Sequence, residues 1–78
     1  MDQDKVRRWK KLCADIIIHA RTCPKNSFMQ YARTYASTGL TMVNEMEISS
    51  QAFYVSNNIR YLNGPKGQDF KERIKEFF

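Results

Sequence analysis

Residues 4–21 constrain the fold of this 78-residue chain more than any other stretch. Their apolar side chains recur at intervals of three, four, three, one and three residues. Such spacing is typical of one face of a helix with a period of about 3.6 residues. The positions are Val6, Trp9, Cys13, Ile16, Ile17 and Ala20. The pattern predicts a long amphipathic helix over residues 4–22, with Trp9 on the face that packs into the core.

A second helix is expected soon after Pro24. This proline stops the first helix, because the residue before a proline is displaced from the helical region of backbone space. Ser27 and Gln30 have the spacing of a capping box, which predicts a helix over residues 28–37. Gly39 suits the end of that helix, since glycine tolerates the left-handed conformation that follows many helices.

The third helical stripe has intervals of four, three, four and three residues, a regular two-turn repeat. It predicts a helix over residues 49–62, capped by Ser49 or Ser50. The stripe consists of Ile48, Ala52, Val55, Ile59 and Leu62. Because it does not continue back to Thr41, we expect a break near residue 48. Two alternatives stay open before it: residues 41–46 form a short helix, or residues 40–43 are extended.

The last helix is predicted over residues 67–77, with Phe70, Ile74 and Phe77 as its apolar stripe. Opposite charges three and four residues apart support its outer face by a few tenths of a kcal/mol each. These pairs are Asp69 with Arg73 and Glu72 with Lys75. Short connections join all the predicted segments, as in compact helical domains. The sequence therefore predicts a single all-α domain, residues 1–78, with four short helices, or five if residues 41–46 form one.

Charge and cysteine content suggest the surroundings of the protein. The net charge of +5 belongs to residues 1–39, and its densest part is Arg7, Arg8, Lys10 and Lys11. Two cysteines are ten residues apart, most of that distance on one predicted helix, so they lie about 15 Å from each other, whereas a disulfide needs less than about 7 Å. No apolar run is long enough to span a membrane. We expect a cytoplasmic protein with free thiols and no membrane partner.

No set of residues has the pattern of a catalytic or metal site. The single histidine, His19, lies four residues from Cys23, and we interpret the two as a helix-end histidine beside a structural thiol. Two cysteines and one histidine do not have the spacing of a zinc site. The three glycines do not form a phosphate-binding loop. We therefore expect no enzyme activity, no cofactor, no metal and no small-molecule substrate.

Nucleic-acid binding is the alternative that the basic residues support. Lysine and arginine side chains neutralise phosphates, and Trp9 could stack on an unpaired base. Trp9 lies on the apolar stripe, however, and we place it in the core. The segment around Ile48 and Ala52 imitates a helix-turn-helix, but the helix that would follow has a single basic residue, Arg60. We regard this match as poor.

Several aromatic residues in the second half fall outside the apolar stripes or crowd the end of the chain. Tyrosine, phenylalanine and methionine are enriched in the cores of protein interfaces. We expect Phe53, Tyr54, Tyr61, Phe77 and Phe78 to contact a partner. The sequence thus predicts a non-enzymatic helical interaction module, of adaptor or regulator type, that binds another protein or a second copy of itself. The basic residues of the first helix would steer it toward an acidic partner.

Overall fold

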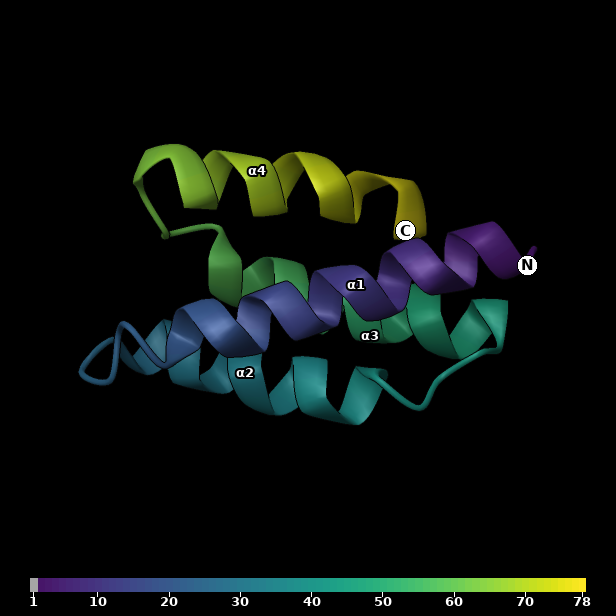
Figure 1. Ribbon diagram of the computed structural model, residues 1–78, viewed down its shortest axis with the longest axis horizontal. Coiled ribbons are helices and arrows are strands. Elements are labelled where there is room, and N and C mark those ends of the chain that lie inside the picture. The colour runs from purple at the N-terminus through teal and green to yellow at the C-terminus, as the bar shows by residue number, and fades with distance from the viewer. Residues whose placement is uncertain (1) are drawn as a thin grey trace.

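The computed structural model describes residues 2–78, and over these residues it consists of four α-helices and a final 3₁₀ turn, with no strand (Figure 1). The predicted small all-α bundle is confirmed. The elements are α1 (Gln3–Ala20), α2 (Ser27–Gly39), α3 (Glu45–Ile59), α4 (Gly64–Ile74) and η1 (Lys75–Phe77).

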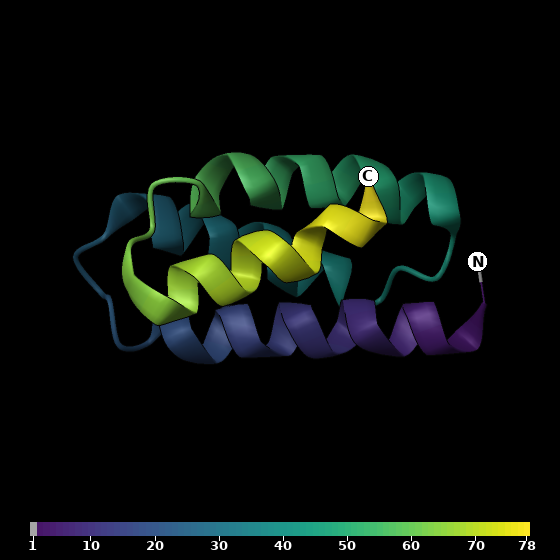
Figure 2. The ribbon, with the colours of Figure 1, turned by 90° about the horizontal axis from the view of Figure 1, so that it is seen from above.

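The first three helices run up, down and up, and the fourth lies across them. In Figure 1, α4 lies on the opposite side of α1 from α2. Figure 2 shows the same helix crossing the space between α1 and α3. The core lies where the four helices meet, and its largest fully buried side chains include Trp9, Phe70, Leu12 and Ile16.

Trp9 is the largest of these core side chains and is fully buried, as predicted. Its indole Nε1 donates a hydrogen bond to the Gly39 carbonyl oxygen at 2.8 Å. The indole also packs edge-on against the Phe77 ring, with ring centroids 5.2 Å apart. The predicted stripe of α1 is confirmed at its centre, but Leu12 is fully buried as well, whereas Val6 and Ile17 are only partly buried.

Gly39 has a different role from the one predicted. It lies within the last turn of α2, and its φ is not positive; among the described residues only Gly64 has a positive φ, of 84°. A Cβ atom at Gly39 would lie 2.7 Å from Cζ2 of Trp9 and 3.2 Å from Sγ of Cys13. Glycine is therefore needed here because the backbone of α2 touches the tryptophan ring.

The caps of α1 and α2 come from the residues just before each helix. The Asp2 side chain accepts a hydrogen bond from the Lys5 amide at 2.7 Å and caps α1. Asn26, not Ser27, caps α2. The amide of Gln30 instead reaches back to the carbonyl oxygens of Ala20 and Cys23, at 2.9 and 3.0 Å. It thereby ties α2 to the end of α1.

The predicted break near residue 48 is wrong. The Asn44 side chain accepts hydrogen bonds from the amides of Met46 and Glu47, at 2.9 and 3.3 Å, so α3 begins one turn earlier than expected. Ile48 is then an interior residue of α3, and residues 41–46 do not form a separate helix. The first turn of α3 could not be predicted from the apolar stripe, because the side chains of residues 45–47 are exposed to solvent.

The end of the chain also differs from the prediction. Helix α4 begins at Gly64, earlier than residue 67, with a proline in its first turn. At Gly67 a Cβ atom would collide with the carbonyl oxygen of Leu62, so glycine lets α4 fold back closely against the end of α3. The turn η1 directs Phe77 into the core, where it is 3% exposed. Phe77 is thus a core residue, which corrects its assignment to the contact surface.

Substituting Gly39 by alanine tests the contact between Trp9 and α2. Alanine in a helix is ordinarily about 1 kcal/mol better than glycine. Here we expect the opposite sign, a loss of about 1–3 kcal/mol of unfolding free energy, because the added methyl group overpacks the indole. Urea denaturation measures the change. Ser37→Ala, at an exposed position of the same helix, is the control and should be nearly neutral. Stabilisation by Gly39→Ala would contradict this packing.

Candidate interaction surfaces

Charged residues are distributed unevenly between the two sides of the bundle. Charged side chains make up 27% of the chain. Between residues 26 and 59, which include all of α2 and α3, the charged residues are only Arg33, Glu45 and Glu47. Residues 48–59 of α3 have none. The side formed by α2 and α3 is therefore nearly uncharged, and the ion pairs lie on α1 and α4.

Helix α3 and the turn after it have a second stripe, opposite the core. Its members are separated by four, three, one, three and four residues, which places them on one helical face. All of them are exposed, and Met46 is 81% exposed. We call this set the outer stripe: Met46, Ser50, Phe53, Tyr54, Asn57 and Tyr61.

Aromatic side chains from α2 flank the outer stripe on one side. The Phe28 ring lies over that of Tyr61, with centroids 4.9 Å apart, and the Tyr35 ring stacks on Tyr54 at 5.5 Å. The position of α2 is fixed there by a 2.7 Å hydrogen bond from the Gln51 amide to the Tyr35 carbonyl oxygen. The α2 rings thus extend the apolar surface of the outer stripe.

Phe78 flanks the outer stripe on the other side. It lines a shallow depression of about 280 Å³ together with Phe53, Tyr54 and two serines of α3. The outer stripe, Phe28, Tyr35 and Phe78 form one continuous surface, which we call the aromatic face.

Four of the five predicted contact residues lie on the aromatic face: Phe53, Tyr54, Tyr61 and Phe78 are 50–58% exposed. Two further aromatic residues of this face come from α2: Phe28 is 46% exposed, and Tyr35 is half-buried. The rings of α2 meet those of α3 across a helix interface. Spacing along either helix alone does not reveal that contact.

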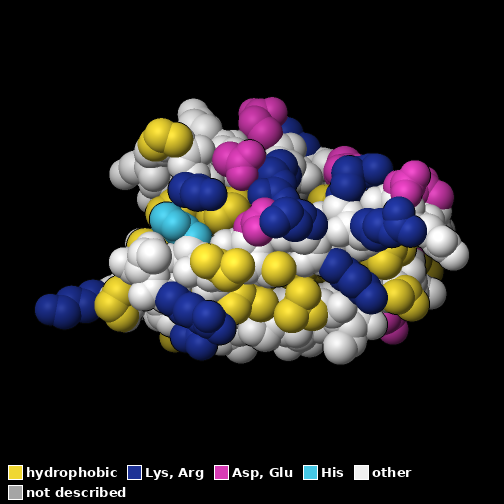
Figure 3. Space-filling model, in the orientation of Figure 1, with side chains coloured by type: hydrophobic (Ala, Val, Ile, Leu, Met, Phe, Trp, Pro, Cys, Tyr) yellow, Lys and Arg dark blue, Asp and Glu magenta, His cyan; other side chains and the backbone are white. Residues whose placement is uncertain are grey.

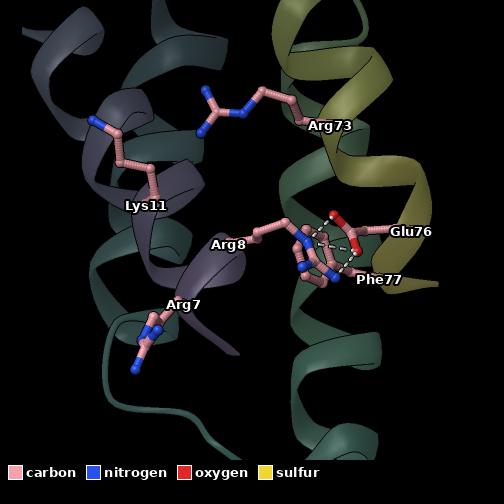
Figure 4. A pocket seen from close by; sticks show the side chains of 6 residues that line it. All are labelled: Arg7, Arg8, Lys11, Arg73, Glu76 and Phe77. Carbon is pink, nitrogen blue, oxygen red and sulfur yellow. Dashed lines mark hydrogen bonds and ion pairs between the residues drawn. The ribbon is translucent and has the colours of Figure 1, made fainter. Parts of the chain in front are cut away.

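The basic residues of α1 form a different kind of surface, because most of them are paired with acids. Arg8 reaches across to η1 and holds both carboxylate oxygens of Glu76, with nitrogen–oxygen distances of 2.9–3.1 Å (Figure 4). Arg7 points away from this pair and lies 3.4 Å from Asp4. The hydrogen bonds that Arg8 donates to the Glu76 carboxylate raise the pKa of Arg8 above its ordinary value.

Asp15 holds two further cations, one from α1 and one from α4. Lys11 Nζ lies 3.1 Å from one of its oxygens and Arg73 lies 2.9 Å from the other. Burial alone would raise the pKa of Asp15, but the hydrogen bonds from Lys11 and Arg73 outweigh that effect and lower it. Arg73 also contacts Asp69 at 3.2 Å.

These cations line a groove of about 270 Å³ between α1 and the end of the chain, with Phe77 at its base. Each of these cations has an acidic partner, but of those partners only Glu76 also lines the groove. Figure 3 shows this mixture, with Lys and Arg side chains interleaved with Asp and Glu over α4 and the neighbouring side of α1. Of the four predicted patch residues, Arg7, Arg8 and Lys11 form ion pairs, and Lys10 has no ion pair within residues 2–78.

His19 and Cys23 do approach each other, with Nε2 and Sγ 3.7 Å apart. No acidic side chain among residues 2–78 hydrogen-bonds to His19, and its ring packs edge-on against Phe70. A catalytic pair needs such an orienting group. The described residues also contain no cluster of three or more histidine, cysteine or acidic side chains that could hold a metal ion. Among residues 2–78, His19 and Cys23 thus have neither an acidic orienting group nor further metal ligands beside them.

Comparison with known proteins does not assign the chain to a family: no family model, curated protein or solved structure matches it. Within residues 2–78, none of the helices has the length and apolar character needed to cross a lipid bilayer.

The ion pairs of Asp15 predict a pH-dependent contribution to stability. Because the folded pKa lies below the ordinary value of 3.8, the contribution is present above that pH and is lost as the pH falls through the folded value. We expect Asp15→Asn to lower the unfolding free energy at pH 7 by up to about 1 kcal/mol. The difference in unfolding free energy between Asp15→Asn and the unsubstituted chain should become smaller as the pH falls below 3.8. Urea titrations over this range measure it.

Glu72→Gln provides the matched control for Asp15→Asn. Among residues 2–78, Glu72 pairs only with Lys75, and both side chains are largely exposed, so the loss of this pair should be close to neutral at every pH. An Asp15→Asn effect of equal size at pH 7 and in acid would show that the amide changes packing and not the ion pairs.

The two cysteines should differ in reactivity. Cys13 is fully buried, and burial raises the pKa of its thiol to about 12. Cys23 is partly exposed at the end of α1. We expect iodoacetamide to modify one thiol of the folded protein and two after denaturation, with Cys23→Ser removing the fast reaction. Mass spectrometry counts the modified thiols in the folded and in the denatured protein. Rapid modification of Cys13 in the folded state would contradict its burial.

Proposed function

We propose that this protein is a non-enzymatic helical interaction module that binds a protein surface through its aromatic face. The observation that carries the proposal is the outer stripe of α3, where large apolar side chains are exposed on a helix that has no charged residue beyond Glu45 and Glu47 in its first turn. A contiguous exposed apolar patch of this kind marks interaction sites in soluble proteins. The free thiols are compatible with a reducing compartment, and we place the protein in the cytoplasm.

The composition of the aromatic face suits protein binding. Phenylalanine, tyrosine and methionine supply large contact areas, and tyrosine hydroxyls satisfy hydrogen bonds at an interface edge. Ring stacking between Tyr35 and Tyr54 already orders part of the face before binding. Side chains ordered in advance lose less conformational entropy on association.

The basic side of α1 has an accessory role in this proposal. With the ion pairs formed, Arg7, Arg8 and Lys11 are compensated locally, but the chain keeps its net charge of +5. This net charge favours approach to acidic partners and acts mainly on the association rate. Nucleic-acid binding through the same residues is less favoured, because each phosphate contact would compete with a carboxylate already in place.

Photo-crosslinking in the native cell tests the aromatic face and requires no candidate partner. Benzoylphenylalanine replaces Phe53 in one variant and Gln68 in a control. Gln68 is exposed on α4, outside the aromatic face. We expect protein adducts from position 53 and few from position 68. The adduct mass separates a second copy, at twice 9.2 kDa, from a different protein.

Equal crosslinking at both positions, or none at position 53, would refute the proposal. A salt titration of binding to single- and double-stranded nucleic acid tests the alternative. Tight binding that weakens steeply with salt, and that is lost on charge reversal at Arg8 and Lys11, would favour nucleic acid instead.

A further inference from the structure

We propose that the aromatic face binds a second copy of this chain, with the two α3 helices antiparallel about a two-fold axis beside Phe53 and Tyr54. The inference rests on the proposed function and specifies the partner. Two observations support it: the symmetry of the outer stripe and the charges at the two ends of α3.

The outer stripe is symmetric about its own centre. In an antiparallel pair related by a two-fold axis, residues at equal distances from the centre meet at the same level along the helices. The midpoint of the outer stripe lies between Phe53 and Tyr54, so large side chains meet large ones and small polar side chains meet small polar ones. The pairs are Met46 with Tyr61, Ser50 with Asn57, and Phe53 with Tyr54.

The charges at the two ends of α3 favour the antiparallel orientation. Glu45 and Glu47 lie in its first turn, and Arg60 caps its other end. Antiparallel packing brings the acidic turn of one copy to the level of Arg60 in the other. Parallel packing would place like charges, and the like ends of both helix dipoles, beside each other. No charged residue lies between these ends, so no ion needs to be desolvated at the centre.

The other side of the bundle is a poorer surface for self-association. The cations that line the groove there, Arg7, Arg8, Lys11 and Arg73, are already paired within one chain, and a second copy would have to compete with those contacts. A dimer interface of standard size would cover roughly 800 Å² on each subunit, about a sixth of the 4972 Å² of accessible surface of one chain.

Sedimentation velocity over a concentration series tests the association itself. We expect a monomer–dimer equilibrium in the unsubstituted chain. Phe53→Glu places two carboxylates near the axis and should raise the dissociation constant about tenfold or more. Gln68→Glu adds the same charge on α4 and should leave the equilibrium unchanged. Circular dichroism establishes that both variants are folded, as expected for exposed positions.

Disulfide trapping tests the orientation. In a Cys23→Ser background, Met46→Cys should not link to itself, because the two copies of position 46 lie about 22 Å apart in the antiparallel pair. An equimolar mixture of Met46→Cys and Tyr61→Cys should give a covalent heterodimer. Self-linking of Met46→Cys would indicate a parallel pair and overturn the arrangement.

A monomer at every concentration would overturn the inference. Photo-crosslinking then distinguishes this failure from that of the proposed function. Adducts of position 53 with a different protein would leave the interaction module intact and remove only self-association. A monomer without adducts at position 53 would refute both.

Discussion

The structure depends on the contact between the Trp9 indole and the backbone of α2. The ring lies between α1 and the last turn of α2, donates to the Gly39 carbonyl oxygen, and supports Phe77 on another edge. Three segments remote in sequence therefore meet on one side chain. In a chain of this size, which buries only about 60% of its unfolded surface, a single large core residue carries a large share of the packing. The position of α2 beside α1 in turn determines where its rings meet those of α3.

The distribution of charge follows from the same arrangement. Helix α1 lies beside α4 and η1, and ion pairs cross both contacts: Arg73 of α4 pairs with Asp15, and Glu76 of η1 pairs with Arg8. Helices α2 and α3 have few charges, and their outward sides expose rings. The molecule thus has one solvated side and one side suited to association. The interaction proposal depends on this division more than on any single residue.

Local patterns predicted much of this fold, and contacts between distant segments did not follow from them. The stripes of α1 and α3 and the pairs on α4 are all short-range features, which sequence spacing describes directly. The start of α3 at Glu45, capped by Asn44, was missed because an exposed first turn has no apolar periodicity. Phe77 was assigned both to the apolar stripe of the last helix and to the contact surface, and its burial agrees with the stripe alone. The pairing of Arg8 with Glu76 spans 68 residues, and no helical spacing indicates it.

Gly67 has a consequence for how relatives of this chain could be found. Its backbone approaches the Leu62 carbonyl so closely that no other residue fits without moving α4. A related protein could exchange most exterior side chains and keep the architecture, yet it would have to retain the tryptophan and both close-packed glycines. Gly39 lies 30 residues after Trp9, and Gly67 lies 28 residues after Gly39. A search by overall sequence identity would not detect so widely spaced a pattern. Distant relatives are therefore better sought by the spacing of Trp9, Gly39 and Gly67 than by sequence identity averaged over the chain.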